Sequence, residues 1–194
     1  MSSILKVDQL QDSGGNAIIT SDGAGNITTG TGMGKVLQTK YYQTGATLTA
    51  TNTSFADLGS FSVTITPSST SSIILLSANF GSAYGGSGNN STMFRFTRNG
   101  TAVAIGDQEG SNRPRTSFRT SSVTKLINGD GNHAIGLTFS AIDTPSSTSA
   151  LTYKIQNWNE GGTFYLNRNV TFDDTVANYS GVSFSSFIVQ EIEA

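Results

Sequence analysis

The sequence predicts an all-β protein, because of its apolar patterning and its composition. No long segment shows the spacing of apolar residues that marks one face of a helix, whereas apolar and polar residues alternate with a period of two in many short segments. Ser, Thr, Asn and Gly take the place of charged residues, which make up only 12% of the 194 residues. These small polar residues favour turns and solvent-facing strand positions over helices.

The alternation gives each of several strands one apolar face. Turn signals separate these strands, and Asn99-Gly100 is a dipeptide that favours a tight hairpin turn. Together with segments 163–169 and 181–193, the pattern predicts about eight to ten strands. The residues expected to face the core are Phe61, Val63, Ile65, Phe94, Phe96, Leu137, Phe139, Ala141, Leu151, Tyr153 and Ile155.

The chain divides into two parts. Residues 1–34 hold one short apolar patch followed by turns rich in Gly and Asn, which is too little apolar mass to form a core. We therefore expect a short extended segment that becomes ordered against copies of itself or against a partner. Residues 35–194 supply the strands of a β-sandwich head domain. The anchor residues of the first part are expected to be Ile4, Leu5, Val7 and Leu10.

Two strands carry apolar residues on both faces, namely the one that begins with the aliphatic run Ile73–Leu76 and the last strand of the chain. A strand in a two-sheet sandwich needs only one apolar face. The second face therefore predicts burial against the N-terminal arm or another subunit or, alternatively, beneath a loop of the same chain. A ring of three copies covers the same face on every subunit, so we expect a homotrimer. The residues predicted at its interface are Ile73, Leu75, Phe187 and Val189.

Composition excludes several classes of function. The formal net charge is −2 and the basic residues form no patch that would follow a phosphate backbone, so no nucleic-acid partner is expected. No apolar run is long enough for a spanning helix, and the first residues lack the pattern of a secretory signal, so no membrane insertion is expected. The chain has no Cys, which excludes disulfides and thiolate metal sites.

Signatures of catalysis are scarce. The single histidine, His133, either hydrogen-bonds locally or meets two other copies around an ion on a trimer axis. The glycine-rich segments 30–35 and 86–90 do not match a phosphate-binding loop. We interpret the acidic residues as solvated loop residues, since the sequence indicates no cleft with paired carboxylates. The sequence therefore predicts a protein that is not an enzyme and that has no metal and no cofactor.

Aromatic residues beside Asn in predicted loops indicate a carbohydrate site. A ring can stack on the apolar face of a sugar while amides bind its hydroxyls, although each ring could instead pack into the core. Arg113, Arg115 and Arg119 form a basic cluster that either contacts an anionic sugar or lies on an exposed face or in a row of intersubunit ion pairs. The predicted receptor-binding residues are Tyr84, Asn89, Asn90, Trp158, Asn159 and Tyr179.

Segments along most of the chain resemble one group of proteins. The opening "MSSILKVDQLQDSGGNAIIT" is similar to the N-terminus of tail-fibre-like virion proteins of marine and freshwater bacteriophages, notably cyanophages. Further blocks of this group are similar, in the same order, to "VTITPSSTSSIILLSANFG", "FTRNGTAVAIG", "TPSSTSALTYKIQ", "GTFYLNRN" and "IVQEIEA". The resemblance extends over residues 1–29 and 61–194.

The resemblance implies a homotrimeric fibre or spike component of a phage virion. The N-terminal segment would attach to other virion proteins, and the head would be a jelly-roll-like β-sandwich that recognises a host-surface glycan. The family pattern supplies no catalytic residues. The chain has no long shaft, so its position on the tail, the baseplate or the capsid surface stays open. Two other functions also stay open: a capsid decoration or baseplate connecting protein with no receptor-binding role, and a glycan-degrading enzyme.

Overall fold

The all-β prediction is confirmed by the computed structural model, because every regular element of the residues that it describes is a strand and none is a helix. These residues hold fourteen strands instead of the roughly eight to ten predicted, because six of the strands span only three residues. The described residues are 7–29, 35–85, 91–120, 134–171 and 181–193. The predicted residues outside them are Ile4, Leu5, Asn89, Asn90, His133 and Tyr179.

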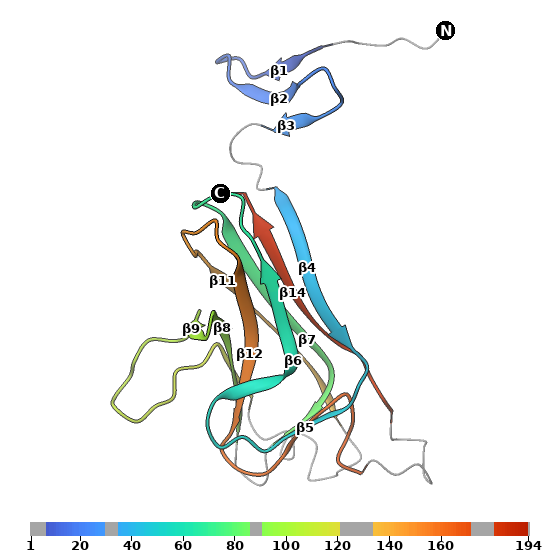
Figure 1. The fold of residues 1–194 in the computed structure, drawn as a ribbon, viewed down its shortest axis with the longest axis vertical. Coiled ribbons are helices and arrows are strands. Elements are labelled where there is room, and N and C mark those ends of the chain that lie inside the picture. Colours follow the sequence, from blue (N-terminus) through green and yellow to red (C-terminus); the bar gives the residue numbers. More distant parts are fainter. Residues whose placement is uncertain (1–6, 30–34, 86–90, 121–133, 172–180, 194) are drawn as a thin grey trace.

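The N-terminal strands form a small antiparallel sheet of their own, which Figure 1 shows beyond one end of the main body of the molecule. Two of the predicted anchor residues, Val7 and Leu10, are exposed, as are large parts of Ile19 and Ile27. We call this unit the N-terminal sheet. Its strands are β1 (Gln9–Gln11), β2 (Ala17–Ser21) and β3 (Ile27–Thr29).

The two turns of the N-terminal sheet repeat one arrangement of hydrogen bonds. Asp12 Oδ1 accepts from the backbone N–H groups of Gly14 and Asn16 at 2.8 and 2.9 Å, and Asn16 Nδ2 donates to Asp12 Oδ2 at 3.0 Å. Asp22 and Asn26 make the equivalent contacts in the second turn. The Asn side chains and the turn N–H groups lower the pKa of both aspartates. Side-chain hydrogen bonds of this kind define a turn without help from a core.

The other strands form two sheets that pack face to face (Figure 1). Each sheet has one strand outside its linear order: β11 (Ile135–Asp143) pairs with β7 (Ile73–Tyr84) in the six-stranded sheet, and β9 (Thr101–Val103) pairs with β8 (Thr92–Arg98) in the five-stranded sheet. The six-stranded sheet has the order β4 (Val36–Thr44), β14 (Ser185–Ile192), β7 (Ile73–Tyr84), β13 (Phe164–Leu166) and β5 (Leu48–Ala50), with β11 (Ile135–Asp143). The five-stranded sheet has the order β10 (Phe118–Thr120), β8 (Thr92–Arg98), β12 (Leu151–Asn159) and β6 (Ala56–Ile65), with β9 (Thr101–Val103).

Four antiparallel pairs of the sandwich are nested along the chain. Strand β4 pairs with β14, β6 with β12, β7 with β11, and β8 with β10. Each pair lies within one sheet, and successive pairs alternate between the six-stranded and the five-stranded sheet. Strand β14 lies between β4 and β7, so the six-stranded sheet is completed only when the last strand is in place.

Phe80 on β7 lies at the centre of the core between the two sheets. Its ring packs edge-on against Phe61 and Phe94 of the opposite sheet, with 5.5 Å between ring centroids in both pairs. Phe96 and Phe187 stack across the sheets at 5.7 Å. Aromatic pairs at these distances add roughly 0.5–1.5 kcal/mol beyond the burial of their area. The rings therefore fix how the two sheets lie on one another.

The predicted inward faces of the alternating strands are confirmed. Asn99 and Gly100 both have positive φ angles, 48° and 83°, as a tight hairpin between β8 and β9 requires. Ala141 is only partly buried and packs against the edge of the core. The predicted residues that lie buried in the core are Phe61, Val63, Ile65, Phe94, Phe96, Leu137, Phe139, Leu151, Tyr153 and Ile155.

The interface prediction is wrong for Phe187 and Val189. Both side chains are fully buried in the core of a single chain, so they cannot contact a neighbouring subunit. The closing strand has apolar residues on both faces, and the face of Phe187 and Val189 is the inner one. Ile73 and Leu75 lie on the outer face of β7 and are partly exposed. Their place in an interface stays a prediction.

Ile73 and Leu75 belong to a larger apolar area on the outer face of the six-stranded sheet, which we call the apolar patch. Ile192 lies opposite Ile73 in the adjacent strand, and Ile142 lies opposite Leu75. Ile142 is 61% exposed and Tyr41 is 63% exposed, so the described residues of this chain leave much of the area uncovered. The patch consists of Val36, Tyr41, Ile73, Leu75, Ile142, Ile188 and Ile192.

A buried carboxylate closes one end of the sandwich. Glu191 on β14 is fully buried, and its oxygens accept hydrogen bonds from Gln38 Nε2 at 2.5 Å and from Ser72 Oγ at 2.7 Å. The N–H and the Oγ of Ser68 donate to it at 2.6 and 2.7 Å. Burial by itself raises the pKa of Glu191, but these hydrogen bonds outweigh it and lower the pKa from 4.5 to about 2. The polar turn before β7 therefore covers this carboxylate and supplies several of its hydrogen-bond donors.

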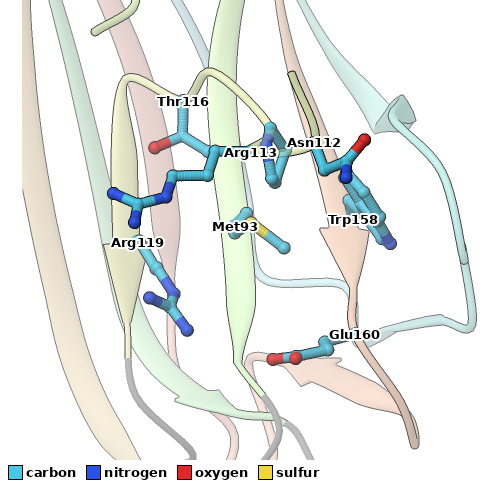
Figure 2. Close-up of a pocket in the computed structure, with 8 residues that line it drawn as sticks. Met93, Asn112, Arg113, Thr116, Arg119, Trp158 and Glu160 are labelled. Carbon is cyan, nitrogen blue, oxygen red and sulfur yellow. The ribbon is translucent and has the colours of Figure 1, made fainter. Parts of the chain in front are cut away.

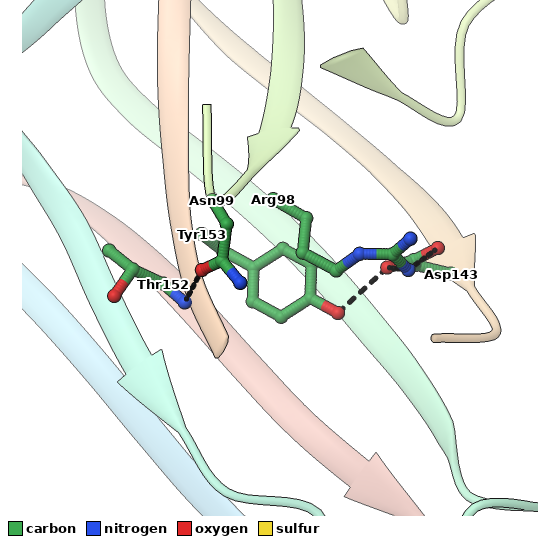
Figure 3. A network of polar contacts seen from close by, with 5 residues as sticks. All are labelled: Arg98, Asn99, Asp143, Thr152 and Tyr153. Atoms are coloured by element: carbon green, nitrogen blue, oxygen red, sulfur yellow. Dashed lines mark hydrogen bonds and ion pairs between the residues drawn. The ribbon is translucent and has the colours of Figure 1, made fainter. Parts of the chain in front are cut away.

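A second acidic residue at the same end joins the two sheets (Figure 3). Asp143 on β11 and Glu191 lie on either side of Ile74. Arg98 Nη1 of the five-stranded sheet lies 2.7 and 3.0 Å from the two Asp143 oxygens, and Tyr153 Oη donates to Asp143 at 2.7 Å. Burial and the Asp143 carboxylate raise the pKa of Tyr153, so its hydroxyl stays a donor. Each of the two carboxylates at this end thus accepts several hydrogen bonds, and Asp143 also has a positively charged partner.

We expect the free energy of unfolding to fall by about 1–3 kcal/mol as the pH is lowered from about 5 to 2. The folded-state pKa of Glu191 is lower than its ordinary value of 4.5. Its contribution is therefore present above pH 4.5 and is lost as the pH falls through the folded-state pKa of about 2. Glu191→Gln should destabilise the fold at neutral pH and make unfolding less dependent on pH in this range.

Denaturant unfolding followed at a series of pH values tests this expectation. Glu193→Gln is the matched control, because Glu193 is exposed two positions further along the same chain end. An acid dependence that is the same in Glu191→Gln as in the unsubstituted chain would contradict the prediction.

Candidate functional site

A pocket of about 500 Å³ opens on the outer face of the five-stranded sheet, between the sheet and the loop that follows β9 (Figure 2). This volume lies within the range of roughly 300–1,000 Å³ that is common for small-ligand sites. The lining combines an aromatic ring, an amide, two guanidinium groups and a carboxylate. The lining residues are Met93, Asn112, Arg113, Pro114, Thr116, Arg119, Trp158 and Glu160.

The floor of the pocket follows from the alternation of β8 and β12. Met93 and Trp158 are directly opposite one another in these paired strands. Their chain neighbours Phe94, Asn157 and Asn159 are fully buried and face the other sheet. Since successive side chains of a strand point to opposite faces, Met93 and Trp158 must lie on the outer face. With Pro114 they supply the apolar part of the lining, although only 5% of Met93 is exposed.

The indole ring of Trp158 is supported from the side. Phe55 packs edge-on against it, with 5.4 Å between ring centroids and 79° between ring planes. The guanidinium carbon of Arg95 lies 4.1 Å above the centre of the Phe55 ring, and Arg95 Nε donates to Gln156 Oε1 at 2.9 Å. A cation over an aromatic face is attractive. Trp158 is thus held in one orientation before a ligand binds.

The loop that forms the outer wall is closed by its own hydrogen bonds. The N–H of Gly106 donates to the Thr116 carbonyl at 3.1 Å, and Arg115 Nε donates to the Gly106 carbonyl at 2.6 Å. Gln108 Nε2 donates to the carbonyl groups of Gly110 and Arg113 at 2.6 and 3.3 Å. The side chain of Arg115 is therefore occupied with the loop backbone, while Arg113 and Arg119 line the pocket.

Ser91 fixes the two charged groups at the lower end of the pocket. Arg119 Nη2 donates to Ser91 Oγ at 2.8 Å. The N–H of Ser91 donates to Glu160 Oε2 at 3.1 Å, and the N–H of Glu160 donates to the Ser91 carbonyl at 3.0 Å. Figure 2 shows Arg113 and Arg119 along one side of the pocket, with Trp158 on the other side and Glu160 below.

Of the receptor-binding residues predicted from sequence, Trp158 lines the pocket. The prediction is wrong for Asn159, which is fully buried, with Nδ2 donating to the Ala50 carbonyl at 3.0 Å and Oδ1 accepting from Thr92 Oγ1 at 3.1 Å. It is also wrong for Tyr84, which is only 7% exposed and packs against Tyr165. The alternative that a ring packs into the fold therefore holds for Tyr84.

Several pocket residues were not predicted from sequence. Arg113, Arg115 and Arg119 were recognised as a basic cluster; all three are exposed, and Arg113 and Arg119 line the pocket. Met93, Asn112 and Glu160 carry no local signal, because their role depends on the pairing of β8 with β12 and on the path of a long loop. Knowledge of that register would have placed Met93 beside Trp158.

No protein-family model and no curated protein matches the sequence. The site is therefore interpreted from the chemistry of its own residues. Within the described residues, no group of three His, Asp or Glu side chains is placed to bind a metal ion. No helix in the described part of the chain has the length and apolar character that crossing a membrane requires. The arrangement that is present can stack a ring, bind hydroxyl groups and attract negative charge.

Proposed function

We propose that this chain is a receptor-binding component of a bacteriophage fibre or spike, that it binds a host-surface glycan, and that it is not an enzyme. The pocket is the observation that carries the binding role. A tryptophan held in one orientation, with an amide and charged groups around it, offers the contacts that sugars need. The assignment to a virion rests on the sequence resemblance described above.

The N-terminal sheet supports attachment to the particle. Its strands leave Val7, Leu10 and Ile27 exposed by 58%, 52% and 60%. So few short strands are stable only when an apolar face is covered. Other virion proteins of the tail, the baseplate or the capsid surface would supply this cover, and residues 1–34 would be the attachment and trimerisation segment.

The nested strand pairs support a jelly-roll-like head. In a jelly roll a long antiparallel ribbon folds over into two sheets of a sandwich. Such a ribbon pairs its first strand with its last and continues inward, as β4 with β14, β6 with β12, β7 with β11, and β8 with β10 do here. Residues 35–194 would be this head.

The apolar patch supports a homotrimer. An uncovered apolar area on a sheet face commonly marks an interaction site, and closed three-fold symmetry would bury the same area on every copy. Ile73 and Leu75 would lie in the interface, together with Ile142. The patch and the pocket belong to different sheets and face away from one another, so assembly through the patch would leave every pocket open to a glycan.

The pocket chemistry supports binding without catalysis. Glycoside hydrolysis commonly uses two carboxyl groups on opposite sides of the scissile bond. Glu160 is the only carboxylate among the described residues that line the pocket.

Multivalent binding by three pockets would strengthen an attachment that is weak at each site.

We expect Trp158→Ala to weaken binding of the labelled chain to host cells by about tenfold or more, because the ring supplies the main apolar contact. The unfolding midpoint should change little, because Trp158 lies on the outer face. Phe184→Ala is the control, since Phe184 is 54% exposed and lies outside the pocket.

Flow cytometry with fluorescent protein measures this binding. Unchanged binding by Trp158→Ala would contradict the site. No binding to any host fraction by a chain that is still incorporated into particles would favour the decoration or connecting role.

We expect sedimentation to give about three times the chain mass of 20.3 kDa at micromolar concentration. Combining Leu75→Glu with Ile142→Glu should yield monomers that keep the circular dichroism spectrum of a β protein, because buried unpaired charges are costly. Ser62→Glu, on the exposed outer side of β6, should leave the assembly unchanged. A monomeric unsubstituted chain would contradict the trimer.

A further inference from the structure

We infer that the pocket selects sugars that carry one carboxylate, such as uronic acids, over neutral sugars. This inference rests on the proposed carbohydrate-binding function and specifies the chemical class of its ligand. It is carried by the two arginines that line the pocket without a carboxylate partner, by the position of Glu160, and by the apolar floor of the pocket.

Two basic side chains near the sandwich surface pair with carboxylates, whereas the two that line the pocket do not. Arg98 forms an ion pair with Asp143, and Lys154 forms one with Asp57, each at 2.7 Å. Within the described residues, the guanidinium of Arg113 makes neither a hydrogen bond nor an ion pair. Arg119 uses only Nη2, in its bond to the uncharged Ser91 hydroxyl. The pocket therefore brings together two guanidinium groups that no carboxylate of the described residues pairs with.

The two guanidinium groups lie on the same side of the pocket, where Figure 2 shows Arg113 above Arg119. A guanidinium presents its N–H donors in a planar fork that matches the two oxygens of a carboxylate. A neutral hydroxyl fills only one of these donors and brings no charge. A carboxylate on this side of the pocket gains charge-assisted hydrogen bonds from two groups that no carboxylate of the described residues already pairs with.

Glu160 limits the charge that the pocket accepts. Two guanidinium groups and one carboxylate leave a single net positive charge among the lining residues. A second negative charge on the ligand would meet the Glu160 oxygens, and like charges repel. Glu160 Oε2 already accepts from the Ser91 N–H at 3.1 Å, and the carboxylate still has lone pairs to accept from sugar hydroxyls. The pocket thus fits a ligand with one acid group and several hydroxyls.

The floor and the far wall fit the rest of a sugar ring. Met93 and Trp158 offer an apolar surface to the C–H groups of a pyranose. Asn112 lies beside Trp158 (Figure 2) and carries an amide that both donates and accepts. A ring that lies on the floor with its carboxylate toward the arginines directs its remaining hydroxyls toward Asn112 and Glu160.

The test compares an oligosaccharide that contains one galacturonate unit with the same oligosaccharide after its carboxylate has been reduced to an alcohol. Isothermal titration of the full chain at low ionic strength should give about tenfold tighter binding of the acidic form, and added salt should reduce this difference. The reduced oligosaccharide with one sulfate ester, which has a similar charge but a different shape, should bind less tightly than the carboxylate form.

Substitutions assign the selectivity to named groups. Arg113→Gln should remove most of the preference for the acidic form without affecting the fold, because this guanidinium holds nothing else in place among the described residues. Arg119→Gln should do the same. Glu160→Gln keeps an acceptor for the Ser91 N–H and should strengthen binding of the acidic form a few-fold. Lys154→Gln is the matched control: it removes one positive charge from the same sheet face outside the pocket, and the preference should stay unchanged.

Three results would overturn the inference. The first is equal binding of the acidic and the reduced oligosaccharides. The second is a sulfate ester that binds as tightly as the carboxylate, since charge alone would then be recognised. The third is a loss of preference in Lys154→Gln as large as in Arg113→Gln. Neutral sugars that bind in a Trp158-dependent way would still support the proposed function, whereas a folded chain that binds host glycans of neither kind would refute both.

Discussion

The packing of the two sheets through one layer of phenylalanine rings is the constraint on which the rest of the structure depends. Phe80 contacts both Phe61 and Phe94, which fixes β7 against β6 and β8. Because successive residues of a strand face opposite sides, fixing the inner side chains also fixes the outer ones. Met93 and Trp158 come to lie side by side on the outer face for this reason. The floor of the pocket is thus determined by core packing, whereas its outer wall is formed by a loop.

The same packing gives the two outer faces of the sandwich different properties. One face carries the apolar patch, and the other carries a polar pocket with an apolar floor. Between them, the end nearest the N-terminal sheet is closed by the buried Glu191 and the partly buried Asp143, whose carboxylates accept hydrogen bonds from both sheets and from the polar turn before β7. Burying these charges is acceptable only because every one of them has nearby donors. Assembly, attachment and ligand binding can therefore use separate surfaces.

Much of this fold could be predicted from sequence, because every second residue of a strand faces the core and the resulting alternation is visible within a short segment. The signal fails where a strand is apolar on both faces: Phe187 and Ile188 are equally apolar, and only the pairing of β14 with β4 and β7 decides that Phe187 faces the core. Trp158 could be predicted as a site residue, but Asn159 could not be excluded, because its partners belong to other strands. The charged wall of the pocket depends on long-range register and on the path of a loop, which composition does not encode.

The proposed site contains the only tryptophan of the chain. Fluorine NMR of protein labelled with fluorotryptophan therefore gives one resonance, and that resonance comes from the pocket. Titration with a short uronic-acid oligosaccharide should shift this resonance in a saturable way, while the carboxyl-reduced form should shift it less. A resonance that stays unchanged under conditions where the same protein binds host cells would contradict the site, because the glycan would then be held elsewhere.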